Sequence, residues 1–369
     1  MVASPSDDAW SVVDMIDQSP PVDCSKPYDT STLAGKTILI TGGASGFGAA
    51  FARHWARHGA HLIIGDVNDR AGEALVAELR SSSSPDQVIL YQHCDVTSWS
   101  DQLALFKTAA SSSKTKSIDA VVAGAGIVER GDPTTPSATS TVFDLPHALD
   151  SDSTTSPPPP PPLRVLAVNL TGVMYTTHLA LYYLPLRAGG DRHLLLISSV
   201  AGLMPLVGQT EYTVSKHGVM GLFRALRGSA WTRGIRVNAL TPYFVDTPLL
   251  PKPALALLAG AAKADLEDVV DAATRLMADW GIRGRALAVG PKMRVVDDEG
   301  DGSRVRMVEG EGRHDGERRQ AVWEVYGHDY ERVEVFVWRY LAVLNVMRRV
   351  RGWVGLVTDM LGLCFGKRA

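Results

Sequence analysis

The sequence predicts an α/β protein whose parallel sheet is covered by helices on both faces. Short apolar, β-branched runs alternate with helical patterns along most of the 369 residues, and a glycine-rich turn joins the first run to the first helix. Strands buried on both faces read as continuous apolar runs, and strands alternating with helices form a parallel sheet. These observations favour a three-layer αβα arrangement with a doubly wound sheet.

The individual elements follow in order along the chain. The apolar runs predict strands at 36–41, 61–66, 86–96, 117–126, 191–200, 234–242 and 284–290. Periodic apolar residues predict helices near 49–60, 70–80, 99–113, 168–188 and 211–233.

Composition and charge exclude several classes of protein. Hydrophobic residues make up 45% of the chain, charged residues 21%, and the formal net charge is −3, which gives no electrostatic case for nucleic-acid binding. The N-terminus lacks the apolar core of a secretory signal, and no stretch approaches the roughly 20 apolar residues of a membrane span. The three cysteines, too widely spaced for a metal site or a disulfide framework, are Cys24, Cys94 and Cys364. We therefore expect a soluble protein of the cytoplasm without a bound metal.

Three parts are expected along the chain. Residues 1–33 are polar and rich in Ser, Asp and Pro, which predicts a loosely attached lead-in. Residues 34–296 form the α/β domain. Residues 297–369 begin with a charged, glycine-rich linker and end in a hydrophobic helical extension at 335–365.

Two segments allow more than one interpretation. The low-complexity insertion 131–162 ends in six prolines and is either a solvated surface insertion, which we favour, or a polyproline II ligand. The helical extension carries Arg348, Arg349 and Arg351 beside Trp353. It would lie on a membrane surface, or cap the protein's own core or a partner subunit, and we favour a capping role.

The turn "ITGGASGFG" predicts a phosphate-binding site. Gly42, Gly46 and Gly48 lie directly after a strand and at the opening of a helix, where glycine permits a tight turn and a close approach to a pyrophosphate. The helix N-terminus offers free N–H groups to the phosphates. Asp66 ends the second strand, where a carboxylate accepts hydrogen bonds from an adenosine ribose and repels a 2′-phosphate. NAD is thus favoured over NADP, although Asp66 also fits a turn or capping role.

A tyrosine and a lysine stand four positions apart in "EYTVSKHGVMGLFRAL". Tyr212 and Lys216 lie on one face of the predicted helix. Taken alone, this spacing fits a catalytic pair or an ordinary packed helix with a lysine extended to solvent.

Seven linked motifs resemble those of the short-chain dehydrogenase/reductase family, in its compact single-domain branch. The resemblance runs from about residue 33 to residue 291, and the pattern is similar to 15-hydroxyprostaglandin dehydrogenase-like members. The motifs are "TGGASGFG" (41–48), "CDVT" (94–97), "AGAG" (123–126), "VNLTG" (168–172), "ISSVAG" (197–202), "YTVSK" (212–216) and "RVNALTP" (236–242).

The resemblance implies a Rossmann-type fold and four catalytic residues. Tyr212 would be the acid/base, and Lys216 would lower its pKa and hold the nicotinamide ribose. Ser199 matches the family serine, and Asn169 the asparagine that kinks its helix and positions a water. A free tyrosine has a pKa of about 10, so a neighbouring ammonium and the positive nicotinamide would be needed to favour the phenolate.

The resemblance also implies the cofactor contacts. We expect them from Gly42, Ser45, Gly46, Phe47, Gly48, Asp66, Asp95, Val96, Gly124, Asn169, Tyr212, Lys216, Val245 and Thr247. Two departures from the family pattern stand out, since Tyr243 replaces the usual glycine after Pro242 and Ala123 replaces an asparagine. The ring of Tyr243 would narrow the nicotinamide or substrate pocket.

These implications define an NAD-dependent alcohol dehydrogenase that interconverts a secondary alcohol and its ketone. The mostly small and apolar stretch 247–270 favours a hydrophobic substrate. The alternatives are an NADPH- or NADH-dependent ketone reductase of secondary metabolism and a non-catalytic nucleotide-binding scaffold. Family members pair through the helices that carry Asn169 and Tyr212, so a homodimer or homotetramer is expected.

Overall fold

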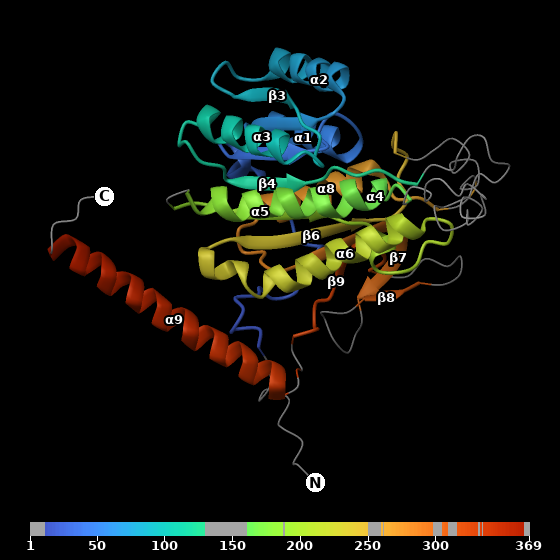
Figure 1. Cartoon of the computed structure of the whole chain (residues 1–369). Helices are drawn as coiled ribbons and strands as arrows, with labels where there is room; N and C mark the ends of the chain where they lie inside the picture. The colour runs from blue at the N-terminus through green and yellow to red at the C-terminus, as the bar shows by residue number, and fades with distance from the viewer. Residues whose placement is uncertain are drawn as a thin grey trace, which may run out of the picture.

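A mostly parallel sheet runs through the centre of the molecule (Figure 1). The structure is a computed structural model that describes residues 12–129, 161–186, 189–249, 260, 262–297, 305–308, 316–330, 333 and 335–364. Its strands are β1 (Thr37–Thr41), β2 (His61–Asp66), β3 (Ile89–His93), β4 (Ala120–Ala123), β5 (His193–Ile197), β6 (Arg236–Pro242), β7 (Ala286–Asp297), β8 (Val305–Met307) and β9 (Arg318–Val325). Across the sheet they follow the order β3-β2-β1-β4-β5-β6-β7-β8, and β9 also pairs with β7.

Helices cover both faces of this sheet, as the sequence predicts. The longer ones are α1 (Gly46–Arg57), α2 (Asp69–Ser82), α3 (Trp99–Ser112), α5 (Val173–Tyr183), α6 (Thr210–Arg227), α8 (Leu266–Ala278) and α9 (Val335–Cys364). The short ones are η1 (Thr30–Leu33), α4 (Arg164–Leu166), η3 (Ala167–Gly172), η4 (Leu184–Leu186), η5 (Val200–Gly202) and η6 (Ala230–Arg233). Most of the proline-rich insertion (131–160) and much of the apolar stretch 247–270 lie outside the described residues.

The alternation of side chains along each strand builds two hydrophobic cores. Ile38 and Ile40 of β1 face the core that α1, α2 and α8 cover. Leu39 between them faces the core beneath α3, α5 and α6. Because successive strand residues point to opposite faces, a continuous apolar run such as "TILI" supplies both cores at once. The three-layer prediction is thus confirmed.

The strand order places a functional edge at the carboxyl ends of β1 and β4. The chain passes outward from β1 to β2 and β3, then returns to pair β4 on the other side of β1. In open α/β sheets ligands bind at this point of reversal, because the loops after the two central strands diverge there. The glycine turn follows β1, so the topology puts it at this edge.

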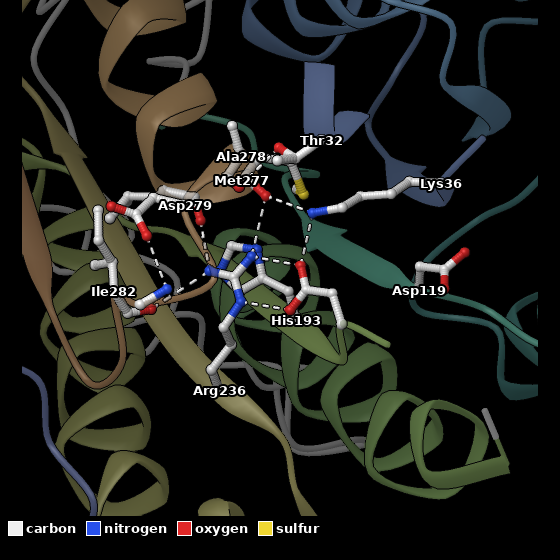
Figure 2. Close-up of polar contacts among 12 residues, drawn as sticks. Thr32, Lys36, Asp119, His193, Arg236, Met277, Ala278, Asp279 and Ile282 are labelled. Atoms are coloured by element: carbon white, nitrogen blue, oxygen red, sulfur yellow. Dashed lines mark hydrogen bonds and ion pairs between the residues drawn. The ribbon is translucent and has the colours of Figure 1, made fainter. Parts of the chain in front are cut away.

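A buried ionic cluster ties the opposite edge of the sheet together (Figure 2). Lys36 precedes β1, and its Nζ lies 2.8 Å from a carboxylate oxygen of Asp191. Arg236, at the start of β6, makes two further bonds of 2.6 and 2.7 Å to Asp191. Lys36 and Arg236 also donate to the carbonyl of Met277, near the end of α8. The two cationic side chains therefore donate hydrogen bonds to a carbonyl group at the C-terminal end of α8, which would otherwise be buried without a partner.

The lead-in is not loosely attached, contrary to the sequence prediction. From residue 12 onward it packs against the body, and the side chains of Val12 and Ile16 are almost fully buried. The N–H of Val22 donates to the Glu324 carboxylate of β9 at 2.6 Å. These contacts join residues some 300 positions apart, a pairing that the polar composition of the lead-in does not reveal.

The charged linker expected from residue 297 is also partly wrong. β7 continues to Asp297, and the segments expected to be linker contribute β8 and the start of β9. Both strands run antiparallel to β7. β8 is only three residues long, and β9 begins with two arginines and a glutamine, so neither carries the apolar run that predicts a strand.

The C-terminal extension forms α9, as predicted. Figure 1 shows this helix standing away from the three layers, with its C-terminal half extending past the body. No helix in the described part of the chain has the length and apolar character needed to cross a membrane.

Candidate active site

Most of the predicted site residues lie at or just after the carboxyl ends of the parallel strands. The glycine turn follows β1, Asp66 ends β2, and Ser199 stands two residues beyond β5. Tyr212 and Lys216 lie in the first two turns of α6. The predicted residues therefore gather at one edge of the sheet, because parallel strands all present their carboxyl ends there.

The glycine turn is built by close backbone contacts. A Cβ on Gly48 would stand 2.3 Å from the carbonyl oxygen of Gly42, and a Cβ on Gly42 would stand 2.5 Å from the Cα of Ala125. Gly42 also has a φ of +69°, a conformation that favours glycine. Only residues without a side chain fit here, as the sequence predicts.

The first turn of α1 is left open to a ligand. Asn68 caps α2 and Ser98 caps α3 through side-chain oxygens, whereas Ser45 at the start of α1 makes no such bond. The first N–H groups of a helix have no intrahelical partner. Those of α1 are thus available to an anion, and a pyrophosphate is the ligand that such a turn suits.

Two carboxylates stand beside the turn. Asp66 accepts hydrogen bonds from the N–H of Ala44 and of Asn68, both at 3.0 Å. Asp95 accepts from the N–H and the hydroxyl of Thr97, both at 2.8 Å. Each is partly exposed and hydrogen-bonded to its own loop, so the loops fix both carboxylates in place.

The remaining predicted cofactor residues line the same region. The N–H of Gly124 donates to the Thr41 hydroxyl at 3.2 Å. A Cβ built on Gly46 would lie 3.9 Å from the Cβ of Thr247, so the glycine turn faces the loop after β6. Phe47 is half-buried against the core that α1 covers, and Val96 and Val245 are buried.

Tyr212 and Lys216 are brought together by one turn of α6. The Nζ of Lys216 lies 5.6 Å from the centre of the Tyr212 ring and donates to the carbonyl of Ile197 at 3.1 Å. Both side chains are buried, at 8% and 4% exposure. Burial lowers the pKa of Lys216 to about 8, so the amine remains largely protonated at neutral pH. Burial raises the pKa of Tyr212, and a hydrogen bond from Ser199 opposes that rise.

Ser199 is held facing the tyrosine by its own loop. Its hydroxyl oxygen accepts from the N–H of Ala201 at 3.2 Å. Its single hydroxyl hydrogen has two acceptors in reach, the carbonyl of Pro242 at 3.4 Å and the phenol oxygen of Tyr212. The neighbouring Ser198 points elsewhere and donates to the carbonyl of Lys216 at 3.1 Å. Ser199 is therefore the serine that the structure places beside Tyr212.

Asn169 occupies a distortion in the helical segment that leads to α5. Residues Ala167–Gly172 form a π-helical turn. Such irregularities within helices are frequent at functional sites. Asn169 is fully buried, and its amide exchanges two 2.8 Å hydrogen bonds with the backbone of Ile127. A Cβ on Gly126 would lie 3.5 Å from Asn169 and 3.6 Å from the Lys216 amine. The helical kink, Gly126 and Lys216 thus meet at one point.

The tyrosine that replaces a family glycine turns toward the core. Tyr243 packs against the cluster beneath α1 and α8, and its N–H donates to Val289 at 2.8 Å. Its ring meets that of Phe244 edge to face, with centroids 4.9 Å apart. An aromatic pair therefore follows Pro242, whose carbonyl accepts the Ser199 bond.

Sequence reasoning missed residues that support the site. Glu129 is buried and accepts from the N–H of Tyr212 at 3.3 Å. Gln209 exchanges bonds with the backbone of Glu129, and so fixes the loop after β4 to the start of α6. Ser215 links the carbonyl of Tyr212 to the amide of Asn169 at 2.7 and 3.2 Å. Spacing gave no signal for these residues, because each makes a hydrogen bond to a segment that is distant in the sequence.

The fold and the site define a Rossmann-type α/β protein whose uncapped helix, close glycine contacts and strand-end carboxylate fit a dinucleotide. Comparison with known proteins identifies the family to which the chain belongs within this class. The family model described as short chain dehydrogenase matches residues 36–254. The chain belongs to that family, whose members are NAD(P)-dependent oxidoreductases.

Curated relatives and solved structures agree with this assignment. A 5'-hydroxyaverantin dehydrogenase of Dothistroma septosporum is 36% identical over 291 residues, covering 74% of this chain and 91% of the relative. A (+)-borneol dehydrogenase 2 of Salvia officinalis is 33% identical over 250 residues, covering 67% and 76%. The crystal structure of levodione reductase has the same fold, with a TM-score of 0.57 and 23% identity over 70% of this chain and 96% of that one.

Proposed function

We propose that this oxidoreductase uses NAD to interconvert a hydrophobic secondary alcohol and its ketone. The observation that carries the proposal is the buried Tyr212, with the Lys216 amine 5.6 Å from its ring and a hydrogen bond from Ser199. A phenol beside an ammonium and a hydroxyl donor can exchange a proton with a carbinol oxygen. NAD, when bound, supplies the hydride acceptor.

The chain's own residues perform the proton chemistry. In the oxidation direction the Tyr212 oxygen accepts the proton from the substrate O–H bond as the carbonyl forms. Ser199 donates a hydrogen bond to the same substrate oxygen and stabilises the charge that develops there. The Lys216 ammonium favours the phenolate form of Tyr212 by its positive charge. Asn169 bonds to the backbone of the loop after β4 and so holds that loop in a fixed position beside the Lys216 amine.

The proposed substrate class rests on the sequence and on the relatives. The stretch 247–270 is mostly small and apolar, which favours a hydrophobic substrate. Two relatives are named as dehydrogenases of hydroxyaverantin and borneol, which supports an apolar alcohol for this chain as well.

Replacement of Tyr212 tests the proposed reaction. A Tyr212→Phe variant keeps the ring packing but loses the proton acceptor, so turnover of hydrophobic secondary alcohols should fall at least about 10³-fold. NAD binding, followed by fluorescence or calorimetry, should remain within about threefold of the wild type. Full activity in the variant would exclude the proposed role, and a wild type that binds neither dinucleotide would exclude the function.

Asp66 supports the choice of NAD over NADP. Its carboxylate stands at the end of β2 beside the glycine turn, and its hydrogen bonds come from backbone N–H groups rather than from cationic side chains. A 2′-phosphate would meet this negative charge. In an Asp66→Asn variant the ratio of kcat/KM for NAD to that for NADP should fall at least about tenfold. An unchanged ratio would show that another group selects the cofactor.

A homo-oligomer in the cytoplasm completes the proposal. The outer faces of α5 and α6 expose Met174, Tyr182 and Val214, each more than half exposed. Apolar side chains clustered on one helical face are typical of subunit contacts. Cys24 and Cys94 are free thiols, which suits a reducing compartment.

A further inference from the structure

The long helix α9 exposes a row of large apolar side chains to its surroundings. Phe336, Tyr340, Val343, Met347 and Val350 follow one another at spacings of four and three residues, which places them on one side of a helix. Their side chains are between 55% and 69% exposed. Val335, Val346 and Trp353 widen this face and are also exposed. We call these eight residues the α9 apolar face.

The opposite side of α9 holds the helix to the body. Trp338, Leu341 and Leu344 are less exposed than the apolar face, and the amide of Asn345 donates to the carbonyl of Met15 at 3.2 Å. The helix is thus attached by its first half. Figure 1 shows no other described element beside its second half. The described part of the body therefore leaves the apolar face uncovered, and the alternative that α9 caps a partner subunit stays a prediction.

The charge of α9 indicates what covers this face instead. The helix contains Arg339, Arg348, Arg349 and Arg351 but a single acidic residue, Asp359, which gives it a net charge of +3. Arg339 and Arg349 are exposed. A helix with an exposed aromatic and aliphatic face and an excess of arginine is typical of segments that lie in the surface of an anionic membrane.

A second copy of α9 fits these features less well. Two-stranded coiled coils flank a narrow apolar seam with charges of opposite sign. Here Val346 and Trp353 broaden the apolar face beyond a seam, and Arg339 lies within the broadened face rather than beside it. Pairing would bring two helices of charge +3 together without acidic partners.

We propose that α9 binds the surface of anionic phospholipid bilayers, lying in the interfacial plane with its apolar face among the acyl chains. The guanidinium groups of Arg339 and Arg349 reach the lipid phosphates, while their aliphatic stems remain beside the apolar face. The binding is peripheral rather than spanning. It brings the enzyme close to the phase in which a hydrophobic alcohol concentrates.

Vesicle co-sedimentation of the full-length protein tests the proposal. The protein should sediment with vesicles of phosphatidylserine and phosphatidylcholine, with at least tenfold weaker partitioning onto pure phosphatidylcholine. Raising the salt concentration should weaken binding to the anionic vesicles. Equal binding to both vesicles would overturn the recognition of anionic lipid, and binding to neither would overturn the proposal as a whole.

Substitutions separate the apolar and the charged contributions. The triple variant Phe336→Ser, Val343→Ser, Val350→Ser should lose vesicle binding at least tenfold, and Arg339→Gln with Arg349→Gln should lose the preference for anionic lipid. A matched control, Met293→Ser with Met307→Ser, removes two exposed apolar side chains from β7 and β8 and should bind as the wild type does.

Two further readouts make the result decisive. Alcohol dehydrogenase activity in solution should stay unchanged in every variant, because α9 supplies no residue of the candidate active site. If the triple variant instead lowers the molar mass in sedimentation equilibrium while the wild type ignores both vesicles, the α9 apolar face joins copies of this chain and the membrane proposal is wrong.

Discussion

At the scale of single residues, burial sets the chemistry of the site. Removal from water lowers the pKa of Lys216 and raises that of Tyr212, so each group is moved away from its charged form. The phenol then depends on its neighbours to become a base, and the hydrogen bond from Ser199 is the neighbour contact that favours the phenolate. If the same three side chains were exposed to water, their pKa values would not depend on one another in this way.

The Ser199→Ala variant should shift the pH profile of alcohol oxidation. Tyr212 is active as a phenolate, and the Ser199 bond lowers its pKa. Without this bond the pKa rises, so the ascending limb of kcat/KM should move to higher pH. Loss of a hydrogen-bond donor to the substrate oxygen should also lower kcat about 10²-fold or more. Initial rates measured between pH 6 and 10 check both effects.

The adjacent serine provides the control for that experiment. Ser198 is buried in the same loop, but its hydroxyl donates to a helix carbonyl. Ser198→Ala should therefore leave the pH limb in place. An identical shift in both variants would show that the loop, rather than the Ser199 hydroxyl, sets the pKa of Tyr212.

At the scale of elements, the N-terminus of α1 combines a missing side-chain cap with the close glycine contacts of the preceding turn. α2 and α3 begin with side-chain caps that complete their own hydrogen bonding, whereas α1 begins without one and next to glycines that contact backbone directly. The strand–turn–helix unit around Gly48 therefore remains open to an external anion.

Gly48→Ala tests this unit. The added methyl group would meet the Gly42 carbonyl and the Gly43 Cα, which are backbone atoms that cannot turn aside. We expect NAD affinity to fall at least about tenfold and the free energy of unfolding to fall by about 1–3 kcal/mol.

Gly221→Ala is the matched control for that substitution. Gly221 lies in α6, and a Cβ there meets nothing within 4 Å. The free energy of unfolding should rise by about 0.5–1 kcal/mol because alanine loses less backbone entropy in a helix. Urea unfolding with and without NAD measures both variants. Equal NAD affinity in wild type and Gly48→Ala would contradict the assigned role of the turn.

The elements predicted from the sequence are those with a local signal. The buried parallel strands and their helices carry continuous apolar runs or a 3.6-residue period, and the structure confirms them from β1 to β6. β8 and β9 were missed because their charged residues resemble a linker. The attachment of the lead-in was missed because it depends on partners such as Glu324, which are distant in sequence.

The residues of the candidate site also divide into those with a local signal in the sequence and those without one. Tyr212, Lys216, Ser199 and Asn169 stand in motifs with fixed local spacing, and the structure brings them together. Their catalytic roles remain predictions. Glu129 accepts a hydrogen bond from a backbone N–H of a separate helix, so no motif spacing predicts it.

At the scale of the whole molecule, the buried cluster around Asp191 locks the edge opposite the site. Burial by itself raises the pKa of Asp191, but the hydrogen bonds and charge of Arg236 outweigh it and hold the pKa well below its usual range. The carboxylate is therefore ionised throughout the physiological range. It joins the chain before β1, the chain before β5 and the start of β6.

The Asp191→Asn variant should destabilise the fold without changing the chemistry. Lys36 and Arg236 would lose the buried carboxylate that they share, at a cost of about 3–5 kcal/mol in the free energy of unfolding. KM for NAD at 10 °C should stay within about threefold, because the cluster lies at the far edge of the sheet. Arg53→Gln breaks the exposed pair with Glu78 and should cost less than about 1 kcal/mol. If urea unfolding showed the same loss of free energy for Asp191→Asn and for Arg53→Gln, the role of burial in the Asp191 cluster would be contradicted.

The added strand β9 has a consequence for assembly. It occupies the hydrogen-bonding groups of β7 that a neighbouring subunit would need in order to prolong the sheet. The new rim carries Arg318 and Arg319, and charged rims discourage strand-to-strand addition. A neighbouring subunit therefore cannot prolong the sheet past β7 in the described structure, which leaves the β3 edge and the helical surfaces for symmetric contacts.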